Sequence, residues 1–262
     1  MFCVAPDPTL VMRFQVHQHG TVASTSETAF EALREHTARH GDVHVAQAQT
    51  RGRGRLGRSW HSDSGLGLYM SVVLLPERVL SPAGLTMAAG LAVRDAVLAL
   101  GLSSARLKWP NDVVVPTAAG EAKLAGILVE TRGLDPEHPH YVVGIGVNVA
   151  QVSFPSELVA ERPVASLRTC GITTDVGGVL AELLPPLARR LDQITLDPTR
   201  LARDFVESLG LSAERVLLVQ GEVAILGRLV SFDVDAGVVI AADDGRQHVV
   251  PLEIVRELRS AR

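Results

Sequence analysis

The chain changes its pattern of predicted secondary structure near Ala213, and this change limits the folds open to it more than any other feature. Beyond that point, short apolar runs are separated by polar segments, two of which contain the turn sequences Asp-Ala-Gly and Asp-Asp-Gly. Such turns are typical of β-hairpins, and about 50 residues of short strands are typical of a small β-barrel. The sequence therefore predicts two domains, over residues 1–212 and 213–262.

The first domain mixes predicted helices with predicted strands. Helices are expected over residues 26–40, 81–101, 176–194 and 198–209, and strands over residues 43–49, 67–75, 123–132 and 141–149. Ser26 and Ser81 are suited as N-caps of the first two helices, and Pro185-Pro186 is expected to kink or split the third. The last two strands are apolar on both faces, so we expect them at the centre of a sheet. This order predicts an α/β (α+β) fold.

The composition argues against several classes of protein. The 29 acidic and 25 basic residues give a net charge of −4, which disfavours a general nucleic-acid binder. Cys3 and Cys170 are the only cysteines and form neither a disulfide framework nor a metal-ligand spacing, so a cytoplasmic location is expected. The N-terminus lacks the charged and apolar regions of a signal peptide, and no apolar run reaches the ~18 residues of a membrane span. We therefore expect no membrane association.

One arginine- and glycine-rich segment, QTRGRGRLGRSW at residues 49–60, differs from this acidic background. Glycines free the backbone for close approach to a ligand, and arginines offer planar donors suited to carboxylates and phosphates. We predict a loop that grips one small anion or a pair of anions. Two alternatives stay open from the residues alone. The segment could be a solvated basic loop, or a nucleic-acid-binding segment, although such segments are usually repetitive.

Two later motifs place charged residues beside predicted strands. In KWPND at residues 108–112, Asp112 is suited to Mg²⁺ bound to phosphates, and Asn111 is suited to orient a neighbouring loop. An Asx-type turn is the alternative. In KLAGILVE at residues 123–130, Lys123 is a compact charge beside an apolar strand, and Gly126 would let a ligand lie against that strand.

Two more motifs are polar and close to glycines or to a helix start. GIGVNV at residues 144–149 contains Asn148, but it does not open a helix, so it is no dinucleotide-binding fingerprint; the chain also has no P-loop. Ser-Thr-Ser at residues 24–26 precedes a predicted helix, where free N–H groups can bind a ligand and simple capping is the alternative. The rare residue types of the chain fall in these motifs: Lys108, Lys123, Asn111, Asn148, Trp60 and Trp109.

Together and in this order, the motifs resemble those of the biotin–protein ligase family. The family pattern G-R-G-R-x-G-R-x-W occurs intact at residues 52–60, and the similarity covers roughly residues 20–150. The resemblance implies a class II synthetase-like catalytic domain with a central mixed sheet, followed by an SH3-like C-terminal barrel. It also implies a reaction with ATP and Mg²⁺, in which biotin is activated as biotinyl-5′-AMP and passed to a lysine of a biotin carboxyl carrier domain.

The resemblance further implies roles for individual residues. Lys123, Arg53 and Arg55 would be catalytic and would surround the biotin carboxylate and the α-phosphate. The other residues implied to bind biotin are Ser24, Thr25, Ser26, Gln49, Gly52, Gly54 and Gly126. Those implied to bind ATP are Arg55, Trp60, Asn111, Asp112, Lys123 and Asn148, with Asp112 near the Mg²⁺ on the phosphates. Lys108 and Lys123 are both expected inside the pocket.

Two positions depart from the family pattern. Ser26 stands where the family commonly has Asn, and Arg51 stands where a small residue commonly precedes the first glycine. Only about twenty residues precede the Ser-Thr-Ser motif, so we expect a short form without a DNA-binding domain and no binding to DNA. A lipoate or octanoyl ligase or transferase of related fold is the alternative function. A homodimer through the edge of the sheet stays open, as does the acceptor protein.

Overall fold

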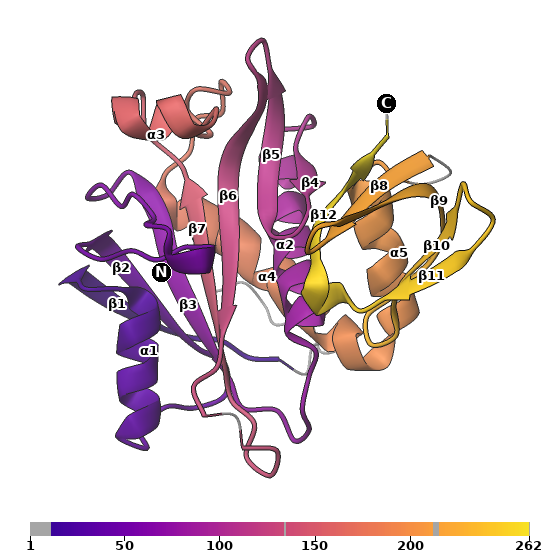
Figure 1. Cartoon of the computed structure of the whole chain (residues 1–262). Helices are drawn as coiled ribbons and strands as arrows, with labels where there is room; N and C mark the ends of the chain where they lie inside the picture. Colours follow the sequence, from indigo (N-terminus) through magenta and orange to yellow (C-terminus); the bar gives the residue numbers. More distant parts are fainter. Residues whose placement is uncertain (1–11, 134, 212–214, 262) are drawn as a thin grey trace.

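The computed structural model describes residues 12–133, 135–211 and 215–261 (Figure 1). It contains a seven-stranded mixed sheet and a five-stranded antiparallel sheet, and helices pack against both. The predicted mixed α/β architecture is confirmed. The predicted domain boundary at residues 212 and 213 lies outside the described residues, and so does Cys3. Within the described ranges, no helix is long and apolar enough to cross a membrane.

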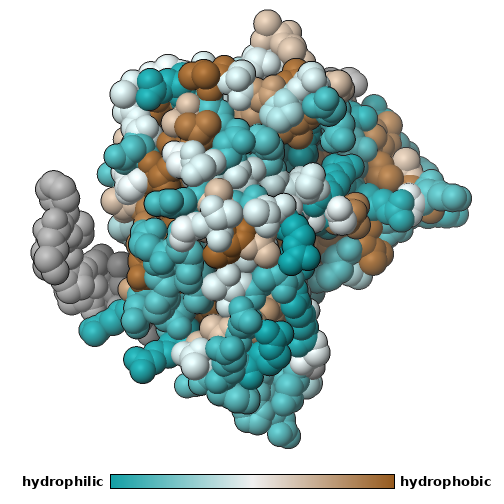
Figure 2. All heavy atoms as spheres, turned by 90° about the vertical axis from the view of Figure 1, so that its left-hand side faces the viewer, coloured by the Kyte–Doolittle hydropathy of each residue, from teal (hydrophilic) through white to brown (hydrophobic). Residues whose placement is uncertain are grey.

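The first sheet has the strand order β1-β2-β3-β7-β6-β5-β4, which confirms the central position predicted for the last two strands of the first domain. β1 and β2 are parallel, and all other neighbours are antiparallel. The bounds are β1 Gln15–Val22, β2 Asp42–Gln49, β3 Gly67–Leu74, β4 Arg106–Lys108, β5 Asp112–Thr117, β6 Gly120–Glu130 and β7 Tyr141–Asn148. The sequence analysis missed β1, whose polar residues lie at an exposed edge. Figure 2 views the molecule from this side and shows mainly hydrophilic residues over its lower half.

Two long helices cover one face of this sheet. α2 (Pro82–Ala99) confirms the predicted helix after Ser81, whose side chain accepts a hydrogen bond from Gly84 N–H. α2 is apolar on almost every side because it packs on the sheet and on α4 (Val176–Leu196). α4 continues as a single helix through Pro185 and Pro186, so of the expected kink or split, the split does not occur. Burial of leucines along α4, each worth about 1.5–3 kcal/mol, offsets the ~3 kcal/mol cost of an interior proline.

The opposite face carries one shorter helix, α1 (Thr25–Arg34). Its N-cap is Ser24 and not Ser26, which lies buried inside the first turn. The helix also ends six residues before the predicted position, because His36 adopts a left-handed conformation with φ 56°. Buried Ala29 and Phe30 pack on Val73 and Val142, so α1 covers only part of this face.

The second sheet has the order β11-β10-β9-β8-β12. Its strands match the predicted short strands: β8 Arg215–Gln220, β9 Val223–Asp233, β10 Gly237–Ala242, β11 Gln247–Val250 and β12 Val255–Ser260. No described strand pairs β11 with β12, so the sheet is open. Trp109 joins the two sheets. Its ring makes edge contacts with Phe232 of β9 and Phe205 of α5 (Pro198–Ser208), and its Nε1 donates to Val255 O at 3.0 Å.

Candidate functional site

A floor of glycines lies on the sheet face that α1 leaves uncovered. Gly126 of β6 is paired with Gly146 of β7, and Gly144 lies two residues before Gly146 on the same strand. A Cβ on Gly146 would lie 2.5 Å from Trp60 Cε2, and one on Gly126 would lie 3.0 Å from Lys123 Nζ. Position 146 therefore needs glycine, because the Trp60 ring packs directly on the strand, and at Gly126 a side chain would press on Lys123 and Trp60. Contact of a ligand with Gly126 stays a prediction.

The arginine- and glycine-rich loop folds as a short hairpin over this floor. Gly54 N–H donates to Arg58 O at 2.7 Å, and Trp60 N–H donates to Gly52 O at 2.9 Å. A Cβ on Gly52 would lie 2.4 Å from Trp60 O, so closure of the hairpin itself requires this glycine. The tip residue Leu56 has φ 56° and is 90% exposed. The hairpin therefore presents a bare apolar side chain at its tip and arginines along its sides.

An inner pocket of about 50 Å³ lies between the hairpin and the sheet. At its polar end, Thr25 N–H donates to Gln49 Oε1 at 2.8 Å, and the hydroxyls of Thr25 and Ser26 lie 2.8 and 3.2 Å from Ser71 Oγ. Ser24, Thr25, Ser26 and Ser71 are all buried. Buried hydroxyl and amide groups gathered in one place are suited to a neutral polar ligand, because they can donate and accept hydrogen bonds.

At the other end of the inner pocket lie Lys123 and Arg55, and we call this the cation end. Among the described residues, the carboxylate that contacts Lys123 is that of Asp112, which lies beside the pocket lining. Lys123 Nζ lies 2.5 Å from Asp112 Oδ1, and Arg162 Nη1 lies 3.9 Å from Asp112 Oδ2. Burial lowers the pKa of Lys123, Asp112 acts against that, and the positive charges of Arg162 and Arg58 lower it further. Burial also lowers the pKa of Arg55, with Asp112 again acting in the opposite direction. Cations thus outnumber the carboxylate at this end, which is the arrangement that binds an anion.

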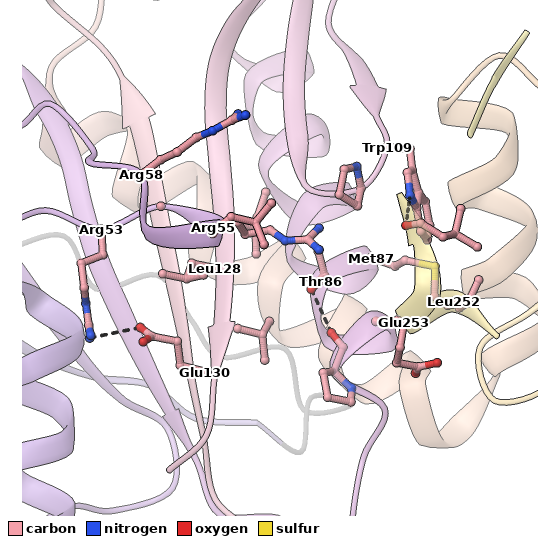
Figure 3. A pocket seen from close by; sticks show the side chains of 18 of the residues that line it. Arg53, Arg55, Arg58, Thr86, Met87, Trp109, Leu128, Glu130, Leu252 and Glu253 are labelled. Atoms are coloured by element: carbon pink, nitrogen blue, oxygen red, sulfur yellow. Dashed lines mark hydrogen bonds and ion pairs between the residues drawn. The ribbon is translucent and has the colours of Figure 1, made fainter. Parts of the chain in front are cut away.

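Arg53 is held at a different place. Its guanidinium pairs with Glu27 of α1 at 3.0 Å and with Glu130 of β6 at 3.2 Å. In Figure 3, Arg53 points toward Glu130, whereas Arg55 points away from it and Arg58 points in a third direction. Arg55 and Lys123 both line the inner pocket and both lie within the electrostatic influence of Asp112, whereas the Arg53 guanidinium is held by Glu27 and Glu130.

Both predicted asparagines bind backbone carbonyls. Asn111 Nδ2 donates to Ile127 O at 2.7 Å, and Asn148 Nδ2 donates to Ala165 O at 2.9 Å. Asn111 also lines the inner pocket, and Asn148 lies behind it, in a small cavity shared with Trp60. Trp60 lies beside Lys123, whose Nζ is 5.4 Å from the centre of the indole ring. Asn111 therefore helps to position strand β6 and Asn148 the segment after α3, and their contacts with ATP stay predictions.

A larger outer cleft of about 580 Å³ lies on the other side of the hairpin (Figure 3). Its walls come from the hairpin, from β6, from the start of α2 and from the segment before β12. Arg53 and Arg55 line both cavities, so the hairpin is their common wall. Trp109 lines only the outer cleft of the two.

One predicted placement is wrong. Lys108 is exposed and pairs with Glu121 at 3.1 Å, because it sits at the end of β4, an edge strand of the first sheet. Sequence reasoning also missed site residues: Glu27, Ser71, Glu130 and Arg162. A lone serine inside the apolar run at residues 67–75 was a signal for the buried polar end. For Glu27, Glu130 and Arg162, nothing in the neighbouring sequence indicates which charged side chains they contact.

The Biotin/lipoate A/B protein ligase family model matches residues 20–148. The biotin--[acetyl-CoA-carboxylase] ligase of Paracoccus denitrificans is 33% identical over 243 residues, covering 89% of this chain and 98% of that protein. The bifunctional ligase/repressor BirA of Bacillus spizizenii is 35% identical over 179 residues, covering 67% of this chain and 53% of that protein. The chain thus matches about half the length of this BirA relative.

Among solved structures, the chain resembles a biotin protein ligase from Aquifex aeolicus in complex with biotin and ATP. The TM-score is 0.74 and the sequence identity is 29%, and the match covers 94% of this chain and 99% of that one. The similarity therefore extends over both sheets and not only over the part that carries the motifs.

Proposed function

The chain belongs to the biotin protein ligase family, and from this premise we propose that it is an ATP-dependent biotin–[biotin carboxyl carrier protein] ligase. In the first step, an oxygen of the biotin carboxylate attacks the α-phosphorus of ATP. The bond to pyrophosphate breaks, and biotinyl-5′-AMP forms. In the second step, the ε-amine of one lysine on a carrier domain attacks the acyl carbon. AMP leaves, and an amide joins biotin to the lysine.

The single observation that carries this proposal is the pairing of a neutral polar end and a cation end in one inner pocket. The ureido ring of biotin is neutral and rich in hydrogen-bonding groups, which suits Ser24, Thr25, Ser26, Gln49 and the serine on β3. The reacting carboxylate and phosphate are both anions. Two unit charges 4 Å apart repel by about 4 kcal/mol near a protein surface, and cations must offset that repulsion.

Lys123 and Arg55 are placed to supply this charge. Both line the inner pocket, and Lys123 lies against the Asp112 carboxylate. Lys123 is paired and buried, so its ammonium is fixed beside Trp60, where we place the adenine. Arg53 can contribute directly only by leaving Glu27 and Glu130. Its contact with the ligand is therefore the least supported of the three catalytic assignments.

Mg²⁺ is proposed to arrive with the ATP phosphates. The described residues contain no group of three or more His, Cys, Asp and Glu side chains that could hold a metal. Asp112 is the only carboxylate at the cation end, and a single carboxylate plus phosphate oxygens is a donor set that suits Mg²⁺. The ion would neutralise phosphate charge there, with Asp112 as its protein ligand.

We also propose that the domains correspond to those of the family. Residues 1–212 would be the class II synthetase-like catalytic domain, and residues 213–262 an SH3-like domain. In support, five short antiparallel strands follow the last helix and pack on it through Phe232 and Phe205.

Release of pyrophosphate tests the reaction. The protein is incubated with ATP, Mg²⁺ and one of three acids: biotin, lipoic acid or octanoic acid. We expect release with biotin alone, followed by transfer of biotin to a carrier domain and not to a carrier variant whose acceptor lysine is arginine. Release with lipoic or octanoic acid in place of biotin would assign the alternative acyl ligase. Salt-dependent binding to nucleic acid with no release for any acid would contradict both.

A further inference from the structure

We infer that Arg162 is a further substrate-binding residue of the cation end, where it binds the phosphates of ATP. The inference rests on the proposed function, because it names a residue for the nucleotide in the same reaction. None of the sequence motifs contains Arg162. It reaches the site from the segment that follows α3 (Ser156–Glu161), a short helix beyond β7.

The backbone around Arg162 is fixed to the start of strand β6. Lys123 N–H donates to Pro163 O at 2.9 Å, and Ala165 N–H donates to Lys123 O at 2.9 Å. These bonds form a parallel bridge between Lys123 and Val164. The segment thus lies directly beside Lys123, and Arg162 at its start contacts the other oxygen of the same carboxylate. Arg162 lines the small cavity that Lys123 and Trp60 also line.

The side chain of Arg162 is poorly paired for an arginine in this position. Among the described residues, its one ion pair is the 3.9 Å contact with Asp112, and its Nε is buried without a hydrogen-bond partner. Arg190 is a structural arginine of the same chain, and its guanidinium has a partner on each side. Its guanidinium lies 2.9 Å from Asp95, 2.5 Å from Asp204 and 3.0 Å from Gln193. Arg162 therefore keeps donors that an anion can use.

The charge count at this place leads to the same conclusion. Lys123 and Arg162 contact one carboxylate, and Arg55 and Arg58 add two more positive charges nearby. Lys123 lies 2.5 Å from one oxygen of Asp112 and Arg162 lies 3.9 Å from the other, so Arg162 is the less tightly held of these two cations. A triphosphate carries several negative charges, and arginine binds phosphate through two parallel N–H groups. ATP is the one proposed substrate with enough charge to engage all of these cations.

The test measures steady-state kinetics of biotin-dependent pyrophosphate release for Arg162→Ala and Arg162→Lys. We expect Arg162→Ala to raise the KM for ATP at least about tenfold, which is one decade or about 1.4 kcal/mol, and to leave the KM for biotin within about twofold. Arg162→Lys should recover part of the loss, since it keeps the charge without the fork. The matched control is Arg168→Ala, an exposed arginine six residues further along the same segment, which should change neither constant.

A second measurement separates contact with phosphate from a merely structural role. Equilibrium binding of ATP and of adenosine, which has no phosphates, is measured for the unaltered protein and for Arg162→Ala. Arg162→Ala should weaken ATP binding at least about tenfold and leave adenosine binding within about twofold, and Arg168→Ala should leave both in place. Equal losses for ATP and adenosine, or equal rises in the KM for ATP and biotin, would overturn the inference. If the unaltered protein releases no pyrophosphate, the proposed function fails instead, and that result is distinct from the first.

Discussion

The two ends of the arginine-rich hairpin have opposite balances of charge. At one end, the Arg53 guanidinium lies between two carboxylates, those of Glu27 and Glu130. At the other end, the single carboxylate of Asp112 is shared by several cations, among them Lys123. Two arginines that are only two residues apart therefore have different surroundings. The first is neutralised by the protein, and the second belongs to a group with spare positive charge.

This difference teaches that residue type alone does not decide which arginine of the loop binds an anion. The carboxylates come from α1, β5 and β6, not from the hairpin. Arg53 is placed to hold the hairpin against the sheet, and Arg55 is placed to act on a ligand. Each of the following experiments either removes this contrast or measures it.

The largest effect is expected from removing the best-buried cation. Lys123→Met should lower the rate of biotinyl-5′-AMP formation at least about a hundredfold, equal to about 2.7 kcal/mol, because the charge nearest to the reacting anions is lost. Lys108→Met is the matched control, since the other lysine of the chain is exposed. Single-turnover adenylation assays would measure both. A normal rate for Lys123→Met would remove the cation end from the reaction.

The next largest effect concerns Arg53. Arg53→Ala should reduce adenylation about tenfold, and Glu27→Gln combined with Glu130→Gln should reduce it several-fold, because both changes release the hairpin from the sheet. Adding Arg53→Ala to the double variant should then cost little more. The same assay serves as the readout. If the losses instead multiply, Arg53 acts on the ligand independently of its two carboxylates, and the contrast between the two ends is lost.

A smaller effect is expected in the pH dependence of Asp112→Asn. The negative charge of Asp112 raises the pKa of Lys123 against the lowering caused by burial and by Arg162 and Arg58. Without that charge, Lys123 should lose its proton at lower pH, so the alkaline limb of the kcat/KM profile should move to lower pH. A limb that stays in place or moves upward would show that Asp112 and Lys123 are not coupled as the structure has them.

The smallest effect is expected on stability, at a place away from the hairpin. His44 stacks between His17 and His19, and burial lowers its pKa to about 4, with Asp42 acting weakly in the opposite direction. The unfolded state binds a proton near pH 6.5 and the folded state does not, so stability should fall as the pH drops from 6.5 toward 4.

His44→Gln should reduce this loss of stability, because up to about one proton fewer is then taken up on unfolding. Chemical denaturation at several pH values would measure the change. The alkaline limb of the activity profile should not move, since His44 is not among the groups that shift the pKa of Lys123. An unaltered acid slope would contradict the role given to His44.

Much of the fold could be predicted from local patterns. The helix after Ser81 and the short strands beyond residue 214 follow from capping and turn residues that act over a few positions. β1 and α3 were missed, because neither has an apolar pattern that tells it from a loop. The first helix was predicted too long. Its end depends on the left-handed conformation of His36, which no local sequence pattern indicates.

For the site, the sequence by itself determined which glycines and polar side chains are available. It supplied the glycines of the hairpin and floor, the buried hydroxyls before α1, and Lys123 beside an apolar strand, and these were enough to indicate the family. Only the tertiary structure decided the pairings: Arg53 with Glu27 and Glu130, Lys123 with Asp112, and Arg162 arriving from beyond α3. The reason is physical. Ion pairs form across a few ångströms of space between residues far apart in the chain, and no local pattern records which charges the sheet brings together.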